Sequence, residues 1–371
     1  MGEVARGCAG YAPIGAYAIV GDCHTDFFHW LTRTQRADPT GVLRTLYTVD
    51  GGADLREVEL RGLQGYRCST PVRVGNAAAG QRQLDIYGDV LTAAYLHFQA
   101  AEPGSPARRE GPSPETWALL RRLVDQAAEH WQEPDNGIWE VRGGRQEFLH
   151  SRLMCWAALD QGIRIAREYS LPAPLGTWER ARAAIRKAIL ERGYNAQSGA
   201  FTQAFGSPAL DASALAVPLV GFLPPTDPRV VSTVERVRAD LSRRGLIHRY
   251  HTPDGLPGGE GAFALCNFWL VDALALGGRL DEAHDLFERV VSYANDVGLM
   301  SEEIDPVTGE LLGNFPQGFT HLALIRAAVN LAKAARHGPE ERPETEAERA
   351  LKARRAAAVG YSAWRRDRRA A

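Results

Sequence analysis

The chain has 371 residues, of which 45% are hydrophobic and 24% are charged, so it can bury a substantial core in one large domain or two smaller ones. Its formal net charge of −2 at pH 7 creates no field that would gather nucleic acid or an anionic membrane, so we expect neither as a partner. The five cysteines form no Cys-x-x-Cys pair, which argues against a zinc cage or a disulfide framework and favours the reducing cytoplasm.

The N-terminal stretch, "MGEVARGCAGYAPIGAYAIVGDCHTDFF", has no basic start followed by a long apolar run, which a secretory signal peptide requires. No window elsewhere offers about 18 uninterrupted apolar residues, so we expect no membrane-spanning helix. Helical periodicity becomes clear from residue 76 onward, where it alternates with loops rich in glycine and proline.

The segment "SPETWALLRRLVDQAAEHW", residues 113–131, shows the pattern of an amphipathic helix. Ser113 suits the N-cap and Pro114 suits the first helical position. Apolar residues then recur at helical spacing, at Trp117, Leu120, Val124, Ala127 and Trp131. One face of this helix should therefore be buried.

The same spacing predicts further helices, near 76–99, 151–169, 177–192, 209–222, 228–243, 261–276, 281–294 and 316–336. Thr177 and Asp281 suit N-caps, and Gly193 and Gly277 suit helix stops. Because the alternation typical of strands is almost absent, the sequence predicts an all-α fold.

The predicted helices are of two kinds. "DASALAVPLVGFL" and "GAFALCNFWLVDALAL" are apolar nearly all round, whereas "TWERARAAIRKAILERG" and "DEAHDLFERVVSYA" each carry one charged face. Buried inner helices with half-exposed outer ones build either an open α-solenoid or a closed α/α toroid. We find no fixed-period repeat, which favours the toroid. The charged, Ala-rich tail after His337 is expected to be a solvated helix or a disordered segment.

Functional residues should lie in the loops, because a helical core does not need charged groups there. The loop "EPDNGIWEVRGG", residues 133–144, places Glu140 directly after Trp139. A carboxyl group held against an indole is suited to protonating a leaving group, and the indole itself is a candidate platform for a ligand.

Two later loops carry more charged residues. In "GLMSEEIDPVTGELLGNFPQGFTH", Glu302, Glu303 and Asp305 precede a turn, without the spacing of an EF-hand calcium loop. Solvated surface acids are the alternative interpretation of this cluster. In "HRYHTPDGLPGGEGAF", Arg249 and Glu260 bracket a Gly- and Pro-rich stretch that lacks the Gly-Lys-Ser/Thr of a phosphate-binding loop, and a sugar-contacting loop suits it better.

A pair of carboxylates from distant loops is what glycoside hydrolysis requires. One acid protonates the glycosidic oxygen while the other activates water or attacks the sugar, and aromatic and Arg side chains bind the sugar. On the residues alone this is one hypothesis among several. The Gly-x-Ser-x-Gly turn of a serine hydrolase is missing from the sequence.

Several long blocks, taken in order, resemble glycoside hydrolase family 15, the glucoamylase-like enzymes that include bacterial α,α-trehalases. They run from "GYRCSTPVRVGNAAAGQRQLDIYGDV" at 65–90 to "NFPQGFTHLALI" at 314–325, and include "GIWEVRG", "SRLMCWAALDQGIRIA", "DASALAVPLVGFLPPTDPRV", "GLPGGEGAFALCNFWLVDALA" and "LMSEEIDPVTGELLGNFPQ". The resemblance implies an (α/α)6 barrel that hydrolyses α-glucosidic bonds with inversion of configuration. We expect no redox or nucleotide cofactor and assign no metal ligand, while a requirement for metal or phosphate stays open.

The resemblance also implies roles for the acids. The general acid is the Glu that follows Trp in "GIWE", Glu140, and the general base is the first Glu of "SEE", Glu302, with its neighbour Glu303 as the alternative. The two carboxylates of an inverting enzyme lie about 6.5–9.5 Å apart, which leaves room for a water molecule.

The same correspondence implies the sugar-binding residues. Trp139 would line the pocket, Arg249 and Glu260 would contact the substrate, and "GNAAAGQ", from Asn76 to Gln81, would help to shape the pocket.

The start of the chain departs from the family. Relatives carry an N-terminal β-sandwich and then a barrel helix with a Trp-Asp-Tyr-Arg and Trp-Leu-Arg-Asp signature, whose Arg and Asp grip the terminal glucose. We align none of this with residues 1–64. We therefore expect a divergent segment with partial barrel helices over 1–64, a barrel without the β-sandwich and incomplete at its first helix over 65–337, and a charged tail over 338–371. An incomplete barrel exposes apolar surface and favours self-association.

Three hypotheses follow. The first is a glucoamylase-like inverting hydrolase that releases glucose from the non-reducing ends of α-glucans or oligosaccharides, and an α,α-trehalase with the same motifs is its alternative. The second, of another class, is a catalytically impaired sugar-binding barrel or vestigial fragment, since loss of the clamp would weaken substrate positioning. A protein-binding helical scaffold would leave the two Glu loops unexplained.

Overall fold

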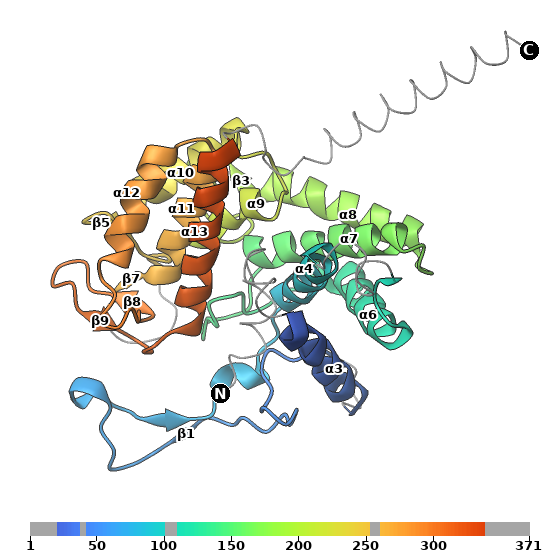
Figure 1. Ribbon diagram of the computed structural model, residues 1–371, viewed down its shortest axis with the longest axis horizontal. Coiled ribbons are helices and arrows are strands. Elements are labelled where there is room, and N and C mark those ends of the chain that lie inside the picture. Colours follow the sequence, from blue (N-terminus) through green and yellow to red (C-terminus); the bar gives the residue numbers. More distant parts are fainter. Residues whose placement is uncertain (1–20, 38–41, 101–109, 253–259, 338–371) are drawn as a thin grey trace, which may run out of the picture.

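The computed structural model describes residues 21–37, 42–100, 110–252 and 260–337. This part of the chain is mostly helical (Figure 1). The α-helices are α3 Gly21–Ala37, α4 Asp85–Ala100, α6 Pro114–His130, α7 Leu149–Glu168, α8 Leu175–Ala188, α9 Ala216–Leu219, α10 Pro228–Asp240, α11 Ala264–Leu276, α12 Leu280–Val291 and α13 Gly318–His337. Shorter helical turns are η1 Tyr66–Cys68, η2 Ala77–Gly80, η3 Ile189–Gly193 and η4 Ala212–Leu215.

The strands in the described residues are two residues long and pair in antiparallel fashion between the helices. They are β1 Val58–Glu59 with β2 Arg73–Val74, β3 Tyr194–Asn195 with β4 Ala200–Phe201, β5 Ser242–Arg243 with β6 Leu246–Ile247, and β7 Ala262–Phe263 with β8 Glu303–Ile304 and β9 Leu311–Leu312. The sheet β7-β8-β9 matters most for function, because Phe263 pairs with Glu303 and so brings the loop at 302 beside the start of α11.

The two predicted layers of helices are confirmed. Helix α11 is buried along 264–275, and α7 is buried along 149–163. Outer helix α12 buries Ala283, Leu286 and Val290 on one face and exposes its acids, as its charged pattern predicted. The helices whose sequences are apolar nearly all round are thus covered on all sides, and those with one charged face expose that face to water.

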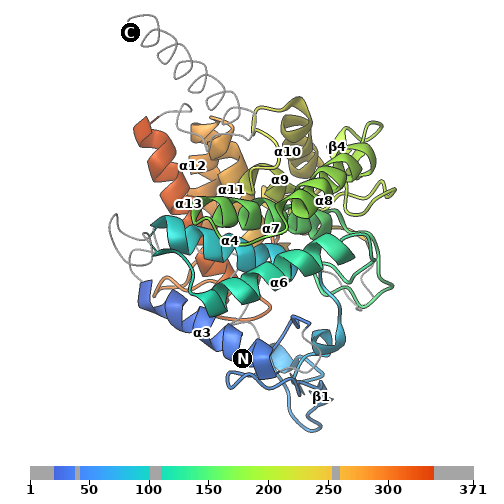
Figure 2. The ribbon, with the colours of Figure 1, turned by 90° about the vertical axis from the view of Figure 1, so that its right-hand side faces the viewer.

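The core has two clusters of buried side chains. One joins α3, α4, α6, α7 and α8, with α7 packed against α4, α6 and α8. The other joins α10 to α13 with the turn that carries Trp139, and α11 packs against α12 and α13. Figure 2 shows α4, α6 and α7 crossing the molecule together, with α11 to α13 beyond them.

Two expected helices are shorter than the apolar pattern indicated. The helix expected over 76–99 divides into η2 and α4, because Asp135 accepts a hydrogen bond from the Leu84 amide at 3.0 Å and holds the intervening residues extended. The helix expected over 209–222 divides into η4 and α9, where the Asp211 carboxylate accepts from the Ser213 amide at 2.7 Å and caps the first of them.

The helix caps were predicted with mixed success. Ser113 does cap α6, accepting from the Thr116 amide at 3.2 Å, and Gly277 does end α11. Thr177 and Asp281 are not N-caps, because α8 begins at Leu175 and α12 at Leu280. Asp281 instead lies in the first turn of α12, where a carboxylate is stabilised by the positive end of the helix dipole.

Residues 1–20 and 38–41 of the divergent segment expected over 1–64, and the whole tail over 338–371, lie outside the described residues. Helix α3 is the first described helix, and it packs against α6. None of the helices in the described ranges combines the length and the apolar character needed to cross a membrane.

Candidate active site

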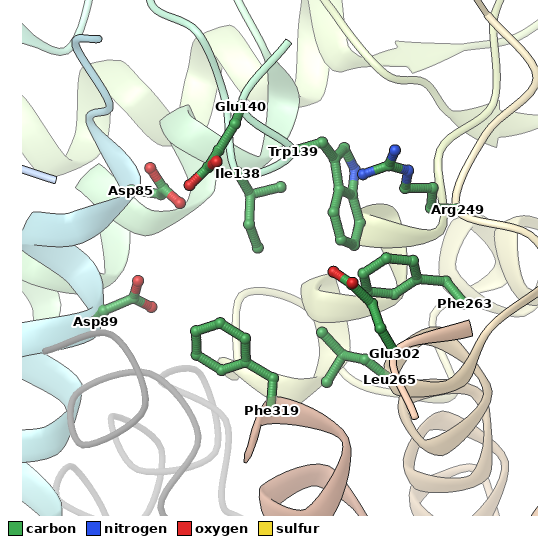
Figure 3. Close-up of a pocket in the computed structure, with 10 residues that line it drawn as sticks. All are labelled: Asp85, Asp89, Ile138, Trp139, Glu140, Arg249, Phe263, Leu265, Glu302 and Phe319. Carbon is green, nitrogen blue, oxygen red and sulfur yellow. The ribbon is translucent and has the colours of Figure 1, made fainter. Parts of the chain in front are cut away.

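A cavity of about 120 Å³ lies where the first turns of α4, α11 and α13 meet the loops at 138–140, 249 and 302. Glu140 and Glu302 extend into it from opposite sides, as Figure 3 shows. The described residues that line it are Asp85, Asp89, Ile138, Trp139, Glu140, Arg249, Phe263, Leu265, Glu302 and Phe319. Drug-sized ligands occupy sites of roughly 300–1,000 Å³, so this cavity fits one small polar ring better than an extended chain.

Glu140 ends a tight turn. Its φ is +56°, a left-handed conformation that residues with side chains rarely adopt. Gly137 opens the turn at φ +67°, and a Cβ there would lie 2.8 Å from the Phe148 ring. Packing against Phe148 thus holds the turn closed, and the strained backbone directs the Glu140 carboxylate toward the cavity, a common use of strain at functional sites.

Two amide side chains from the expected "GNAAAGQ" segment hold Glu140 in place. Asn76 Nδ2 donates to Glu140 Oε2 at 3.4 Å, and Gln81 Nε2 donates to the Glu140 carbonyl oxygen at 3.0 Å and to that of Val141 at 3.4 Å. Asn76 and Gln81 are not among the lining residues. They therefore shape the site by positioning its acid.

Glu302 is positioned by β8 and β9. Its Oε2 accepts hydrogen bonds from the Asn314 amide at 3.0 Å and from Asn314 Nδ2 at 3.1 Å. Gly313 has φ +71°, and a Cβ there would lie 2.7 Å from Glu302 Oε2. A glycine at 313 is thus needed for the carboxylate to approach the Asn314 backbone.

The structure distinguishes Glu302 from the adjacent Glu303. Glu302 directly precedes β8 and continues its pairing, since its amide donates to the Asn314 carbonyl oxygen at 2.9 Å. Successive side chains of such an extended segment point to opposite faces, so the two acids do not enter the same cavity. Glu303 Oε2 accepts a hydrogen bond from the Gly261 amide at 2.9 Å, and Glu303 does not line the cavity.

Arg249 lines the cavity, and Glu260 lies beside it. The Arg249 guanidinium forms a bidentate ion pair with Glu260, in which Nε donates to Oε2 at 2.8 Å. It also lies over aromatic rings, 5.3 Å from the centre of Phe263 and 5.8 Å from that of Trp139. Glu260 itself is not a lining residue, so its contact in this structure is with Arg249.

Trp139 forms part of the wall and is only 9% exposed. Its Nε1 donates to both oxygens of Asp211, at 2.9 and 3.0 Å, and its ring packs edge-on to Phe263 at 5.3 Å. The indole is therefore fixed, and only a small part of its surface is open to a ligand.

Two acids in the lining were not expected from the sequence. Asp85 and Asp89 lie four residues apart in the first turns of α4 and face the cavity together (Figure 3). The signal was visible in "LDIYGDV", where two acids at helical spacing interrupt a segment whose other residues are mostly apolar. In the described residues no group of three or more His, Cys, Asp or Glu side chains is arranged to hold a metal ion.

Four carboxylates and one guanidinium in a half-enclosed, aromatic-walled cavity can bind a neutral polar molecule and transfer protons. Glu140 and Glu302 line this cavity from opposite sides, and their expected separation of about 6.5–9.5 Å stays a prediction.

The chain matches the family "Glycosyl hydrolases family 15" over residues 14–329. This match begins before residue 65, where the blocks quoted above begin, and so includes much of the N-terminal segment.

Among curated proteins, the chain is 44% identical over 314 residues to a trehalase of Mycobacterium tuberculosis, covering 83% of this chain and 45% of the relative. It is 43% identical to a trehalase of Mycolicibacterium smegmatis, covering 83% and 46%, and 36% identical to a trehalase of Thermoplasma volcanium, covering 83% and 47%. The chain therefore spans about half the length of the curated relatives it matches.

Solved structures share the fold. A glycosidase variant in complex with glucose superposes with a TM-score of 0.66 at 20% identity, covering 88% of this chain and 86% of that chain. A glucoamylase from Saccharomycopsis fibuligera superposes with a TM-score of 0.61 at 12% identity, covering 86% and 82%. The likeness confirms the predicted α/α barrel.

Proposed function

Because the chain belongs to glycosyl hydrolase family 15, we propose that it is a glycoside hydrolase that cleaves α-glucosidic bonds with Glu140 and Glu302. The observation that supports this most is the placement of both acids in one small cavity, on opposite sides (Figure 3). The two acids come from loops about 160 residues apart, so their convergence is a property of the fold rather than of a local motif.

The proposed reaction is a single displacement. Glu140 gives its proton to the glycosidic oxygen as the bond from that oxygen to the anomeric carbon breaks. Glu302 accepts a proton from a water molecule, whose oxygen bonds to the anomeric carbon from the opposite face. The products are an alcohol and β-glucose, and Glu140 is left ionised while Glu302 is left protonated, so a proton must return to Glu140 before the next cycle.

The hydrogen bonds of the two acids suit these roles. Asn314 donates two hydrogen bonds to Oε2 of Glu302, which hold this carboxylate at a defined place at the cavity. Asn76 and Gln81 fix the acid and its backbone, so that the proton donor is held at a defined place before the substrate arrives.

We propose α,α-trehalose as the first substrate, because the curated relatives are named trehalases. Release of glucose from the non-reducing ends of maltooligosaccharides or starch, the first hypothesis from the sequence, becomes the second. A cavity that fits about one ring suits both substrates, because each would place one terminal glucose ring in it.

The test is glucose release by the purified chain from trehalose, maltose, maltooligosaccharides and starch, with the anomers followed by NMR. Inverting cleavage of trehalose should yield α- and β-glucose in equal amounts at early times, because one ring is inverted and the other leaves with its configuration unchanged. Glu140→Gln and Glu302→Gln should each lower kcat by about 10²–10⁴-fold.

Glu303→Gln is the matched control, since it removes the adjacent carboxylate and should retain most of the activity. If Glu303→Gln were as inactive as Glu302→Gln and kept its fold, the assignment of the base would be wrong. If the folded, monodisperse chain released no glucose from any of the four substrates, the hydrolase proposal would fail, and sugar binding without turnover would remain as the alternative.

A further inference from the structure

Asp85 is a buried carboxylate at the edge of the cavity. It is the first residue of α4, it is 0% exposed, and it lines the cavity beside Glu140 (Figure 3). Neither of its carboxylate oxygens has a hydrogen-bond partner in the structure described here. The nearest ring nitrogen, His150 Nδ1, lies 3.9 Å from Oδ2, beyond hydrogen-bond distance.

Other buried aspartates in the described residues differ from Asp85 in this respect. Asp135 accepts from the Leu84 amide and from Ser151, at 3.0 and 2.6 Å. Asp272 is bonded by Arg326 and Asn330, and Asp211 by Trp139, Gln203 and the Ser213 amide. Those carboxylates are structural, because each satisfies groups of the protein.

A buried carboxylate without hydrogen bonds is costly, so the folded chain keeps Asp85 at the expense of stability. The start of α4 offsets part of the cost, since the helix dipole favours negative charge there. Its acceptors remain available to hydrogen-bond donors that enter the cavity.

The lining also defines the charge of the ligand. Asp85, Asp89, Glu140 and Glu302 are acids, and the guanidinium among the described lining residues, Arg249, is already paired with Glu260. An anionic ligand would meet the acids Asp85, Asp89 and Glu302 and would be repelled. A neutral molecule with several hydroxyl groups supplies donors to the acids without a charge of its own.

We propose that Asp85 is a substrate-binding residue that accepts hydrogen bonds from ring hydroxyls of an unphosphorylated sugar held between Glu140 and Glu302. This inference rests on the proposed function for the identity of the ligand as a sugar. It adds a binding carboxylate on α4 to the two acids of the reaction.

The test compares two buried Asp→Asn variants of the full chain. In Asp85→Asn, binding of D-glucose measured by NMR titration should weaken by about 10- to 100-fold, while the Tm should stay equal to that of the wild type or rise. In Asp272→Asn, the matched control, the Tm should fall and glucose affinity should change little, because that carboxylate is bonded only within the protein core. A purely structural Asp85 would instead give a lower Tm.

A series of monodeoxyglucoses identifies the contact. One analogue should lack the hydroxyl group that donates its hydrogen bond to Asp85. The wild type should bind this analogue more weakly than glucose, and Asp85→Asn should bind it about as weakly as the wild type does. Glucose 6-phosphate should bind the wild type at least about 10-fold more weakly than glucose.

The inference would be overturned if Asp85→Asn bound glucose and every deoxy analogue as the wild type does, or if the wild type bound no glucose or trehalose. Stabilisation of the wild type by Ca²⁺ or Mg²⁺ that disappears in Asp85→Asn would overturn the inference in favour of a cation site.

Failure of this inference can be told apart from failure of the proposed function. Glucose binding that depends on Asp85 without any hydrolysis refutes only the proposed reaction, whereas hydrolysis with unchanged binding in Asp85→Asn refutes only this inference.

Discussion

At the scale of single residues, the candidate acid depends on amide donors from a distant segment. Glu140 adopts a φ of +56°, and Gln81 contacts the carbonyl oxygens of both Glu140 and Val141. A residue in this conformation persists only when its surroundings determine it. Gln81 therefore helps to maintain the geometry of Glu140 without lining the cavity.

Gln81→Glu tests this positioning role. The substituted side chain keeps its shape but loses the donated N–H and places an acid beside two carbonyl oxygens, so the Glu140 turn should relax. We expect kcat for the proposed hydrolysis to fall by about 10- to 100-fold with a small change in KM, since misplacing a catalytic group affects the transition state most. Gln132→Glu, at an exposed position, serves as the control, and a change confined to KM would contradict the positioning role.

At the scale of secondary-structure elements, a glycine makes the contact between α4 and α7 possible. Gly88 lies within α4, between Asp85 and Asp89, and a Cβ there would lie 2.3 Å from the Met154 carbonyl oxygen of α7. Because that atom belongs to the backbone, the two helices would have to move apart. The two aspartates would move with α4.

Gly88→Ala should therefore destabilise the chain, although Ala ordinarily favours a helix over Gly. We expect a loss of about 1–3 kcal/mol in the free energy of unfolding, as for overpacked cores, measured by urea denaturation. Gly176→Ala in α8 is the control, since its Cβ would meet only the end of the Arg180 side chain, at 3.5 Å. Equal stabilities of the two variants would show that α4 and α7 can separate without cost.

At the scale of the whole molecule, the cavity joins the two halves of the core. Asp85 and Asp89 come from the half built around α7, whereas Phe263, Glu302 and Phe319 come from the half built around α11. The described part of the N-terminal segment exposes several apolar side chains, among them Val49, Val58 and Leu63. Self-association of the chain through exposed apolar surface stays a prediction, which sedimentation at several concentrations would check.

The stability of the whole chain should depend on pH through Asp135. Burial, with a smaller contribution from the charge of Asp85, raises the pKa of Asp135 from its ordinary 3.8 to about 6, although hydrogen bonds from Ser151 and the Leu84 amide oppose the rise. Between these two values the folded chain binds a proton that the unfolded chain releases. Folding should therefore be stabilised by this group as the pH falls from about 6 to about 4, and this contribution should be lost as the pH rises through 6.

Asp135→Asn isolates this contribution, since an amide does not titrate. The shift of about two pKa units corresponds to about 3 kcal/mol, so the stability of the wild type relative to the variant should increase by up to that amount between pH 7 and pH 4. The measurement is thermal unfolding of both proteins across this range. A stability difference that stays constant with pH would show that Asp135 is ionised in the folded chain throughout.

Sequence patterns predicted the helices better than the site. The long helices α6, α7, α11 and α13 were recognisable because a half-buried helix must repeat apolar residues on one face, and a fully buried one must be apolar all round. Prediction failed where a side chain from elsewhere competes for the backbone, as Asp135 does at Leu84. Such competition depends on which residues meet in space and leaves no periodicity in the sequence.

The sequence by itself determined the all-α character, the inner and outer layers, and the loops in which Glu140, Glu302 and Arg249 occur. These features follow from local patterns of polarity and from motifs that can be read along the chain. Only the tertiary structure decided that Glu302 rather than Glu303 lines the cavity, that Glu260 lies against Arg249, and that Asp85 and Asp89 complete the wall. One physical reason is that an extended segment directs adjacent side chains to opposite faces. The other is that elements from both halves of the chain form the cavity, so contacts between residues distant in sequence decide which side chains line it.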